Sequence, residues 1–262
     1  MNGLLSRMGR LVKPEIGIDN VQLHGVIGYL NDTVASTTSS WSVKRKSIML
    51  GAFLLACYGC SLRGNEGLYL EGSDLCRYIN TGKDGIFEVN GKQRAEGHVC
   101  LPLQGRFKNE DGEQKHMMVM VNEGKSGLKF RLWLERLVFV LTREGKQNLA
   151  GPAFCHEDGS MIMSHEMNDG FVALIQKLSF DKPHLFGAGI DLDRHYGISR
   201  SLRRGANSRA QEEGVSIDLR KFINRWSSYE AKKGRRPNMS MAEHYLETRL
   251  ILKRTLVYSK AL

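Results

Sequence analysis

The sequence lacks the cysteine content of a secreted, disulfide-stabilised protein. Its 262 residues include five cysteines, an odd number, in a chain long enough to bury a core without cross-links. Cys57 and Cys60 form a C-x-x-C pair, but no second pair and no nearby histidine completes a zinc site, so we interpret them as core residues. This use of cysteine favours a reducing, intracellular compartment, which would be the nucleus in a eukaryote.

A long hydrophobic run is missing as well. The most apolar segment, Ile48 to Cys60, has 13 residues, whereas a membrane-spanning helix needs about 20. Met1 to Lys13 is basic but has no apolar core of the kind that a secretory signal carries. The sequence also has no internal repeat and no pair of histidines at a metal-binding spacing such as H-E-x-x-H. We therefore expect neither a membrane protein, nor a solenoid, nor a zinc enzyme.

The sequence has an excess of positive charge, concentrated in one segment. The formal net charge is +10, and residues 194 to 236 contain 12 Lys and Arg against 4 Asp and Glu. Such a local concentration indicates an electrostatic footprint for a polyanion such as DNA.

Hydrophobic periodicity predicts an α+β domain that is mainly α-helical with a small antiparallel β-sheet. Apolar residues at helical spacing predict helices over 44–60, 128–141, 171–178, 200–213 and from 219 to about 226. Residues 98–104 and 115–121 are β-prone, and the polar N-E-D-G-E-Q loop between them predicts a hairpin with Lys108 near its tip. Residues 1–25 are weakly patterned, and we interpret them as a linker or the remnant of a preceding domain, with the main domain over 26–262.

Five short motifs stand in a fixed order along the chain. They are R-G-N-E at 63–66, G-R-F-K at 105–108, S-L-R-R-G at 201–205, N-R-W at 224–226 and H-Y at 244–245. On these motifs, residues from about 40 to about 250 resemble the catalytic domain of the tyrosine recombinases, or phage integrases, and most closely the Crypton-type transposon recombinases. The order fits the family's Arg, Lys, His-x-x-Arg, His-or-Trp and Tyr series, and Trp226 follows Arg203 by 23 residues, as the resemblance leads us to expect.

The resemblance implies DNA cleavage and rejoining through a 3′-phosphotyrosine, in DNA integration or transposition, without a metal or nucleotide cofactor. Tyr245, on a helix that the Ser240 capping box opens, would be the nucleophile. Arg63 and Arg203 would fork onto the scissile phosphate, and Lys108 would donate a proton to the leaving 5′ oxygen.

The same resemblance implies two further catalytic residues, Arg200 and Trp226, and one supporting residue, Glu66. Arg200 would hold a phosphate oxygen, the Trp226 indole would donate its N–H to another, and Glu66 would orient Arg63 through a buried ion pair. We expect double-stranded DNA as the partner and a homo-oligomer, dimer or tetramer, on that DNA. The residues that we expect to contact DNA outside the catalytic set are Arg204, Arg209, Lys232, Lys233, Arg235 and Arg236.

Each motif also has a purely structural interpretation. An isolated Arg-x-x-Glu is usually an ion pair on a helix surface, and a tryptophan at helical spacing from Leu219 and Ile223 is usually a core residue. Lys115 and Lys125 lie near Lys108 in the sequence and compete with it for the role of the acid.

Two departures from the family pattern keep other functions open. Arg200 stands where the family most often has histidine, and arginine cannot shuttle a proton near neutral pH. Trp226 and Tyr245 are 19 residues apart, more than in the bacterial members, and the excess is the polar stretch Ser227 to Met239. The alternatives are a catalytically retired DNA-binding protein derived from a recombinase, and a topoisomerase that relaxes DNA without choosing a site.

Overall fold

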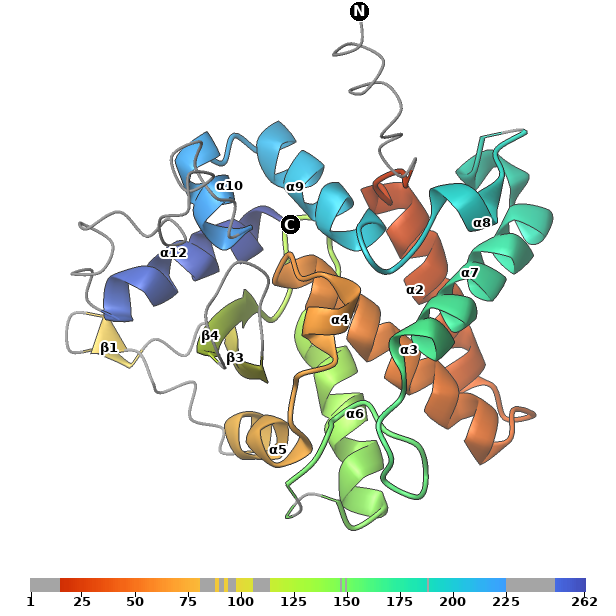
Figure 1. The fold of residues 1–262 in the computed structure, drawn as a ribbon, viewed down its shortest axis with the longest axis horizontal. Coiled ribbons are helices and arrows are strands. Elements are labelled where there is room, and N and C mark those ends of the chain that lie inside the picture. The colour runs from red at the N-terminus through yellow and green to blue at the C-terminus, as the bar shows by residue number, and fades with distance from the viewer. Residues whose placement is uncertain are drawn as a thin grey trace, which may run out of the picture.

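The computed structural model describes residues 15–80, 88–89, 92–93, 98–105, 114–146, 148, 150–187, 189–224 and 248–262, and within these ranges the chain is mainly helical (Figure 1). The elements, in chain order, are α2 (Asn20–Ala35), α3 (Trp41–Gly59), α4 (Gly64–Gly67), α5 (Gly72–Asn80), β1 (Glu88–Val89), β2 (Lys92–Gln93), β3 (His98–Gly105), β4 (Gln114–Val121), α6 (Phe130–Arg143), α7 (Ser164–Asp181), the 3-10 helix η1 (Pro183–Leu185), α8 (Leu192–His195), α9 (Ser201–Glu212), α10 (Ile217–Ile223) and α12 (Thr248–Ala261). The predicted α+β class, mainly helical with a small antiparallel sheet, is confirmed.

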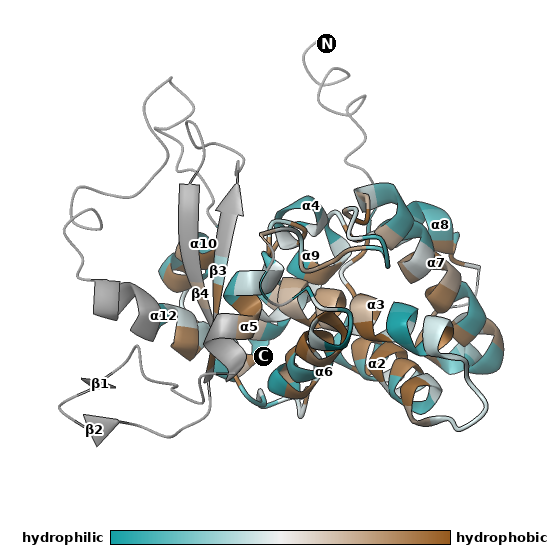
Figure 2. Cartoon of the chain, turned by 90° about the horizontal axis from the view of Figure 1, so that it is seen from below, coloured by the Kyte–Doolittle hydropathy of each residue, from teal (hydrophilic) through white to brown (hydrophobic). Residues whose placement is uncertain are grey.

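The core is built around α3, whose residues are buried along most of its length. This helix packs against α2, α6, α7 and α9, and the hydrophobic faces of α2, α3 and α6 meet in Figure 2. The apolar segment that begins at Ile48 is thus the centre of a globular core. Gly51 allows α6 to approach α3 closely, because a Cβ atom there would overlap the ring of Trp133.

Cys57 and Cys60 are buried thiols at the end of α3, outside any disulfide, as expected of core residues. In the part of the chain that the structure describes, no group of three or more His, Cys, Asp or Glu side chains is placed to hold a metal ion. Within the same ranges, no helix combines the length and the apolar character that crossing a membrane requires.

The predicted hairpin is confirmed. β3 and β4 pair antiparallel, from His98 opposite Val121 to Gly105 opposite Gln114. The C-terminal helix α12 packs on β4, where the Val121 backbone N–H donates to the Ser259 hydroxyl over 2.9 Å. Lys108, expected near the tip of the hairpin, lies outside the described residues.

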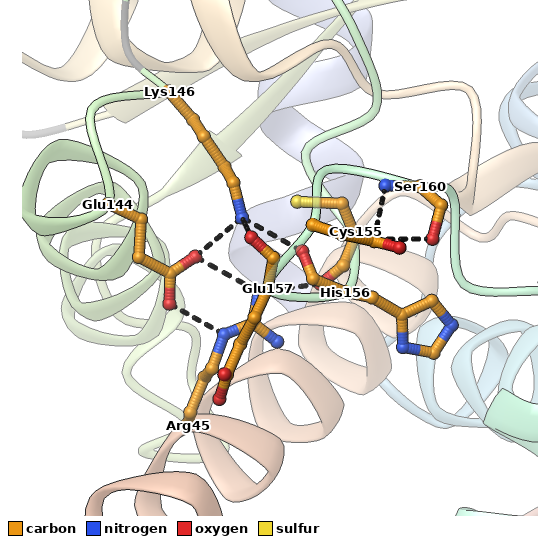
Figure 3. Close-up of polar contacts among 8 residues, drawn as sticks. Arg45, Glu144, Lys146, Cys155, His156, Glu157 and Ser160 are labelled. Atoms are coloured by element: carbon orange, nitrogen blue, oxygen red, sulfur yellow. Dashed lines mark hydrogen bonds and ion pairs between the residues drawn. The ribbon is translucent and has the colours of Figure 1, made fainter.

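A buried ion cluster joins the start of α3 to the end of α6 (Figure 3). Arg45 donates to both carboxylate oxygens of Glu144, at 2.6 and 3.1 Å, and to the carbonyl of Cys155 at 2.8 Å. The Lys146 ammonium donates to Glu144 and to the carbonyls of His156 and Glu157, each at 2.8 Å. Burial alone would raise the pKa of Glu144, but the hydrogen bonds from the two cations outweigh it, so this pKa lies below its usual value. Backbone carbonyls accept the other hydrogen bonds of the two cations, so the donors are used within the cluster and we interpret its function as structural.

The chain before α2 crosses the start of α9. Ile16 N–H donates to the His195 carbonyl at 2.6 Å, and Ile18 N–H donates to the Ser201 carbonyl at 3.0 Å. Ile18 is fully buried, and a Cβ atom on Gly205 would overlap its carbonyl oxygen. The domain boundary expected at residue 25 falls inside α2, so the packed chain includes residues from 15 onward. This crossing segment fixes the helix that carries Arg203.

We predict that Gly205→Ala lowers the free energy of unfolding by roughly 1 to 3 kcal/mol, because the added methyl group must displace the backbone at Ile18. The matched control is Gly28→Ala, an exposed position within α2 where an added Cβ meets no atom within 4 Å. That change should stabilise the protein by about 0.5 to 1 kcal/mol, the helical preference for alanine. Urea unfolding measures both, and equal effects of the two changes would contradict the close packing at Gly205.

Candidate active site

The turn between α3 and α4 positions Arg63. The N–H of Ser61 donates to the Tyr58 carbonyl at 3.1 Å and that of Leu62 to the Cys57 carbonyl at 2.8 Å, which is the hydrogen-bond pattern of a Schellman motif. Ser61 therefore takes the left-handed conformation, with φ +51°, that glycine usually occupies. Because Leu62 is buried, the chain leaves the core at Arg63, the residue before α4.

Glu66 brings two arginines together. One of its carboxylate oxygens accepts from the Arg63 Nη1–H group at 2.6 Å, and the other accepts from the Arg63 backbone N–H at 2.8 Å. The second oxygen also lies 3.7 Å from an Arg203 guanidinium nitrogen. Glu66 is only 1% exposed, and a buried carboxylate is costly unless cations pair with it. The arginine and glutamate of the R-G-N-E motif are therefore not a surface helix pair.

Arg203 joins three parts of the fold. It lies on α9, is 6% exposed, and its Nε–H donates to the Asn224 side-chain oxygen at 3.0 Å. Asn224 follows α10 directly, and Ser61, in the turn before Arg63, donates its hydroxyl to the same Asn224 oxygen at 2.8 Å. The two arginines, which are far apart in the sequence, thus meet where α4, α9 and α10 come together.

The other basic residues on α9 are placed differently. Arg200, one turn before Arg203, is exposed at the start of the helix. Arg204 is half-buried and donates to the Glu15 carbonyl, which ties the crossing segment to α9. Arg209 is half-buried and pairs with Glu213 at 2.5 Å. Arg204 and Arg209 therefore make contacts within the chain, and Arg200 faces solvent.

The remaining predicted residues lie outside the described ranges. They are Lys108, Trp226, Lys232, Lys233, Arg235, Arg236 and Tyr245. The described chain ends at Asn224, beside Arg203, and resumes at Thr248 in α12, which packs against α9 and α10. In the sequence, Trp226 and Tyr245 lie between α10 and α12.

Ser61 and Asn224 were not among the predicted site residues. Asn224 is the first residue of the N-R-W motif, but no role followed from its position, because hydrophobic periodicity marks apolar residues only. The one available signal was a polar residue at the end of an amphipathic helix, two residues before Trp226.

The helices and the β3–β4 hairpin have a fold that resembles the catalytic domain of a tyrosine recombinase. The chain is similar to the XerH site-specific recombinase bound to difH substrate in a pre-cleavage complex, with a TM-score of 0.51, 13% identity, and coverage of 84% of this chain and 50% of that one. A post-cleavage complex of XerH with a palindromic difH substrate gives the same TM-score and identity, with 84% and 49% coverage. The chain thus spans about half the length of the XerH chain. No protein-family model and no curated protein matches the sequence.

Proposed function

We propose that this chain is the catalytic domain of a site-specific DNA recombinase that cleaves and rejoins DNA through a 3′-phosphotyrosine. The observation that carries the proposal is the convergence of Arg63 and Arg203 on the buried Glu66 carboxylate. Two positive charges against one negative charge leave a net positive site. Two guanidinium groups held in place suit a phosphate diester, since each can donate two parallel hydrogen bonds to its oxygens.

In the proposed reaction, the Tyr245 phenol oxygen attacks the scissile phosphorus, and the phenol proton passes to solvent. The bond from phosphorus to the 5′ oxygen breaks, and Lys108 gives that oxygen a proton. Arg63 and Arg203 stabilise the charge that develops on the non-bridging oxygens, with Arg200 and Trp226 as further donors. The reverse reaction, with a new 5′ hydroxyl as nucleophile, rejoins the strands.

The biological setting is part of the same proposal. DNA would be bound by the basic residues of segment 194–236, and protomers would assemble as a dimer or tetramer on paired sites inside the cell. The reaction would serve DNA integration or transposition, as the resemblance to Crypton-type recombinases implies. The XerH complexes, whose protein is named a site-specific recombinase bound to its substrate, support recombination in particular.

A covalent trap tests this proposal directly. The purified protein is incubated with duplex oligonucleotides nicked close to the cleavage position, so that the short strand diffuses away and rejoining stops. We expect a protein–DNA adduct that survives denaturation. Tight DNA binding with no adduct on any nicked duplex would favour the retired DNA-binding protein, for which the exposed Arg200 in place of a histidine is the supporting observation.

We predict that the logarithm of DNA affinity falls linearly with the logarithm of salt concentration, with a slope that corresponds to on the order of 5 phosphate contacts. Neutralising four residues of the basic segment should weaken binding and flatten that slope: Lys232, Lys233, Arg235 and Arg236. The control removes four exposed charges elsewhere: Lys46, Lys129, Lys177 and Lys182. A salt-independent affinity, or equal effects of the two sets, would rule out the basic segment as the DNA contact.

We predict that Lys108→Ala slows cleavage of an ordinary phosphodiester by roughly 100-fold or more, the usual contribution of a general acid. The variant should recover on a substrate with sulfur in place of the 5′ bridging oxygen, because a thiolate leaves without a proton. Lys115→Ala, in β4 opposite Gln104, is the matched control and should show neither effect. Rescue of Lys115→Ala instead would move the acid to β4.

A further inference from the structure

Asn224 has a buried side-chain amide that forms hydrogen bonds with Arg203 and with residues next to the arginine pair. Its side-chain oxygen accepts from Arg203 Nε–H at 3.0 Å and from the Ser61 hydroxyl at 2.8 Å. Its side-chain nitrogen donates to the Arg220 carbonyl at 2.8 Å and lies 3.4 Å from the Asn207 side-chain oxygen. The direction of the amide is fixed by its partners, since an arginine can only donate and a carbonyl can only accept.

We propose that Asn224 is a positioning residue that sets the orientation of the Arg203 guanidinium for DNA cleavage, an inference that rests on the proposed function. The guanidinium is planar, so two fixed points determine where its remaining N–H groups point. Those points are the hydrogen bond from Arg203 Nε–H to Asn224 and the ion pair of Arg203 Nη1 with Glu66. Without Asn224, the side chain would keep its charge but would lose the hydrogen bond that fixes its Nε–H group.

The backbone at Ser61 supports this role. A residue with a Cβ atom in the left-handed region costs on the order of 1 kcal/mol relative to glycine, and Ser61 has φ +51° there. Its side chain, fully buried, is used for the hydrogen bond to Asn224. The turn before Arg63 is therefore linked to Arg203 through a single amide oxygen.

The place of Asn224 in the chain gives the contact a second consequence. The residue ends α10, and the N-R-W motif continues from it directly to Trp226. The phenol of Tyr258, in α12, lies beside the Ser61 and Asn224 side chains. Burial raises the pKa of this phenol, and those two side chains oppose the rise. Through Asn224, the orientation of Arg203 therefore depends on where α10 ends.

The test compares single-turnover cleavage of nicked duplexes by three variants. Asn224→Leu removes the hydrogen bonds at similar volume, and we expect a fall in rate of roughly 10- to 100-fold, the loss of one hydrogen bond to a charged group. Ser61→Gly should leave the melting temperature unchanged or raise it, because glycine suits φ +51°, and still slow cleavage. Asn207→Ala removes only the 3.4 Å contact and should cleave at the wild-type rate.

A double-mutant cycle separates positioning from general destabilisation. Lysine at position 203 has no Nε–H group at the place of the contact, so Asn224→Leu should have little further effect when combined with Arg203→Lys. DNA affinity should stay within threefold for every variant, or about 0.6 kcal/mol. Additive rate losses, or a Ser61→Gly protein that cleaves normally while Asn224→Leu loses only stability, would overturn the positioning role.

A readout without DNA keeps this inference separate from the proposed function. In nitrogen-15 spectra, the Arg203 Nε–H signal should be protected from exchange with water in the wild type and in Asn207→Ala, and unprotected in Asn224→Leu. Equal protection in all three proteins would show that Asn224 does not hold this guanidinium. A wild-type protein that forms no adduct would contradict the proposed function, and the exchange measurement would still decide whether Asn224 fixes Arg203.

Discussion

Replacing Tyr245 with phenylalanine is expected to abolish the covalent DNA adduct and to leave DNA affinity unchanged within about twofold. The substitution removes only the phenolic oxygen, which in the proposed reaction makes the bond to phosphorus, and it changes no charge that holds DNA. The rate of adduct formation on nicked duplexes and the affinity from a binding isotherm measure the two effects. No other single change should separate cleavage from binding so completely.

Tyr258→Phe is the matched control. Tyr258 is 1% exposed in α12, and burial raises the pKa of its phenol, so it is neither accessible to DNA nor readily ionised. That variant should still form the adduct. An adduct that persists in Tyr245→Phe and disappears in Tyr258→Phe would move the nucleophile to α12.

Replacing Arg203 with alanine is expected to slow cleavage by about two to three decades, because one donor to charge that develops in a transition state contributes roughly 3 to 4 kcal/mol. The structure adds a second cause. Glu66 is buried, so without Arg203 the carboxylate retains Arg63 as its cationic partner in the described site, and that pairing competes with the phosphate for the Arg63 guanidinium. Single-turnover rates at saturating protein measure the loss apart from binding.

The control for Arg203 is Arg209→Ala, six residues later on α9. It removes the same charge from the same helix, but Arg209 is half-buried and pairs with Glu213. Its loss should alter affinity and leave the single-turnover rate unchanged. Arg203→Ala with a wild-type rate at saturation would show that the convergence on Glu66 only stabilises the fold.

The sequence predicted those elements whose pattern is local. The segment that forms α6 has apolar residues at helical spacing, and the segments that form β3 and β4 are β-prone and flank a polar loop. α2 was not predicted, because its buried face includes the polar Gln22, which donates to the Leu185 carbonyl at 2.9 Å. The crossing of α9 by residues 15 to 18 depends on close backbone packing at Gly205, which leaves no periodic signal.

For the candidate site too, the sequence predicted residues that stand in local motifs but not the contacts between them. Arg63, Glu66 and Arg203 stand in motifs, and their chemistry could be inferred from the residue types alone. Their meeting on the Glu66 carboxylate was not predicted, because the ion pair from Glu66 to Arg203 joins helices far apart in the sequence. The link through Ser61 and Asn224 could not be predicted, since it needs a left-handed residue and a helix end to lie side by side.

Identification of the amino acid bound to DNA tests the central claim most directly. The adduct from a nicked duplex is digested with protease and nuclease, and the modified peptide is sequenced by mass spectrometry. We predict a nucleotide 3′-phosphate on the tyrosine of the peptide that contains Tyr245. No adduct at all, or a phosphate on another residue such as Tyr229 or Tyr258, would contradict the account.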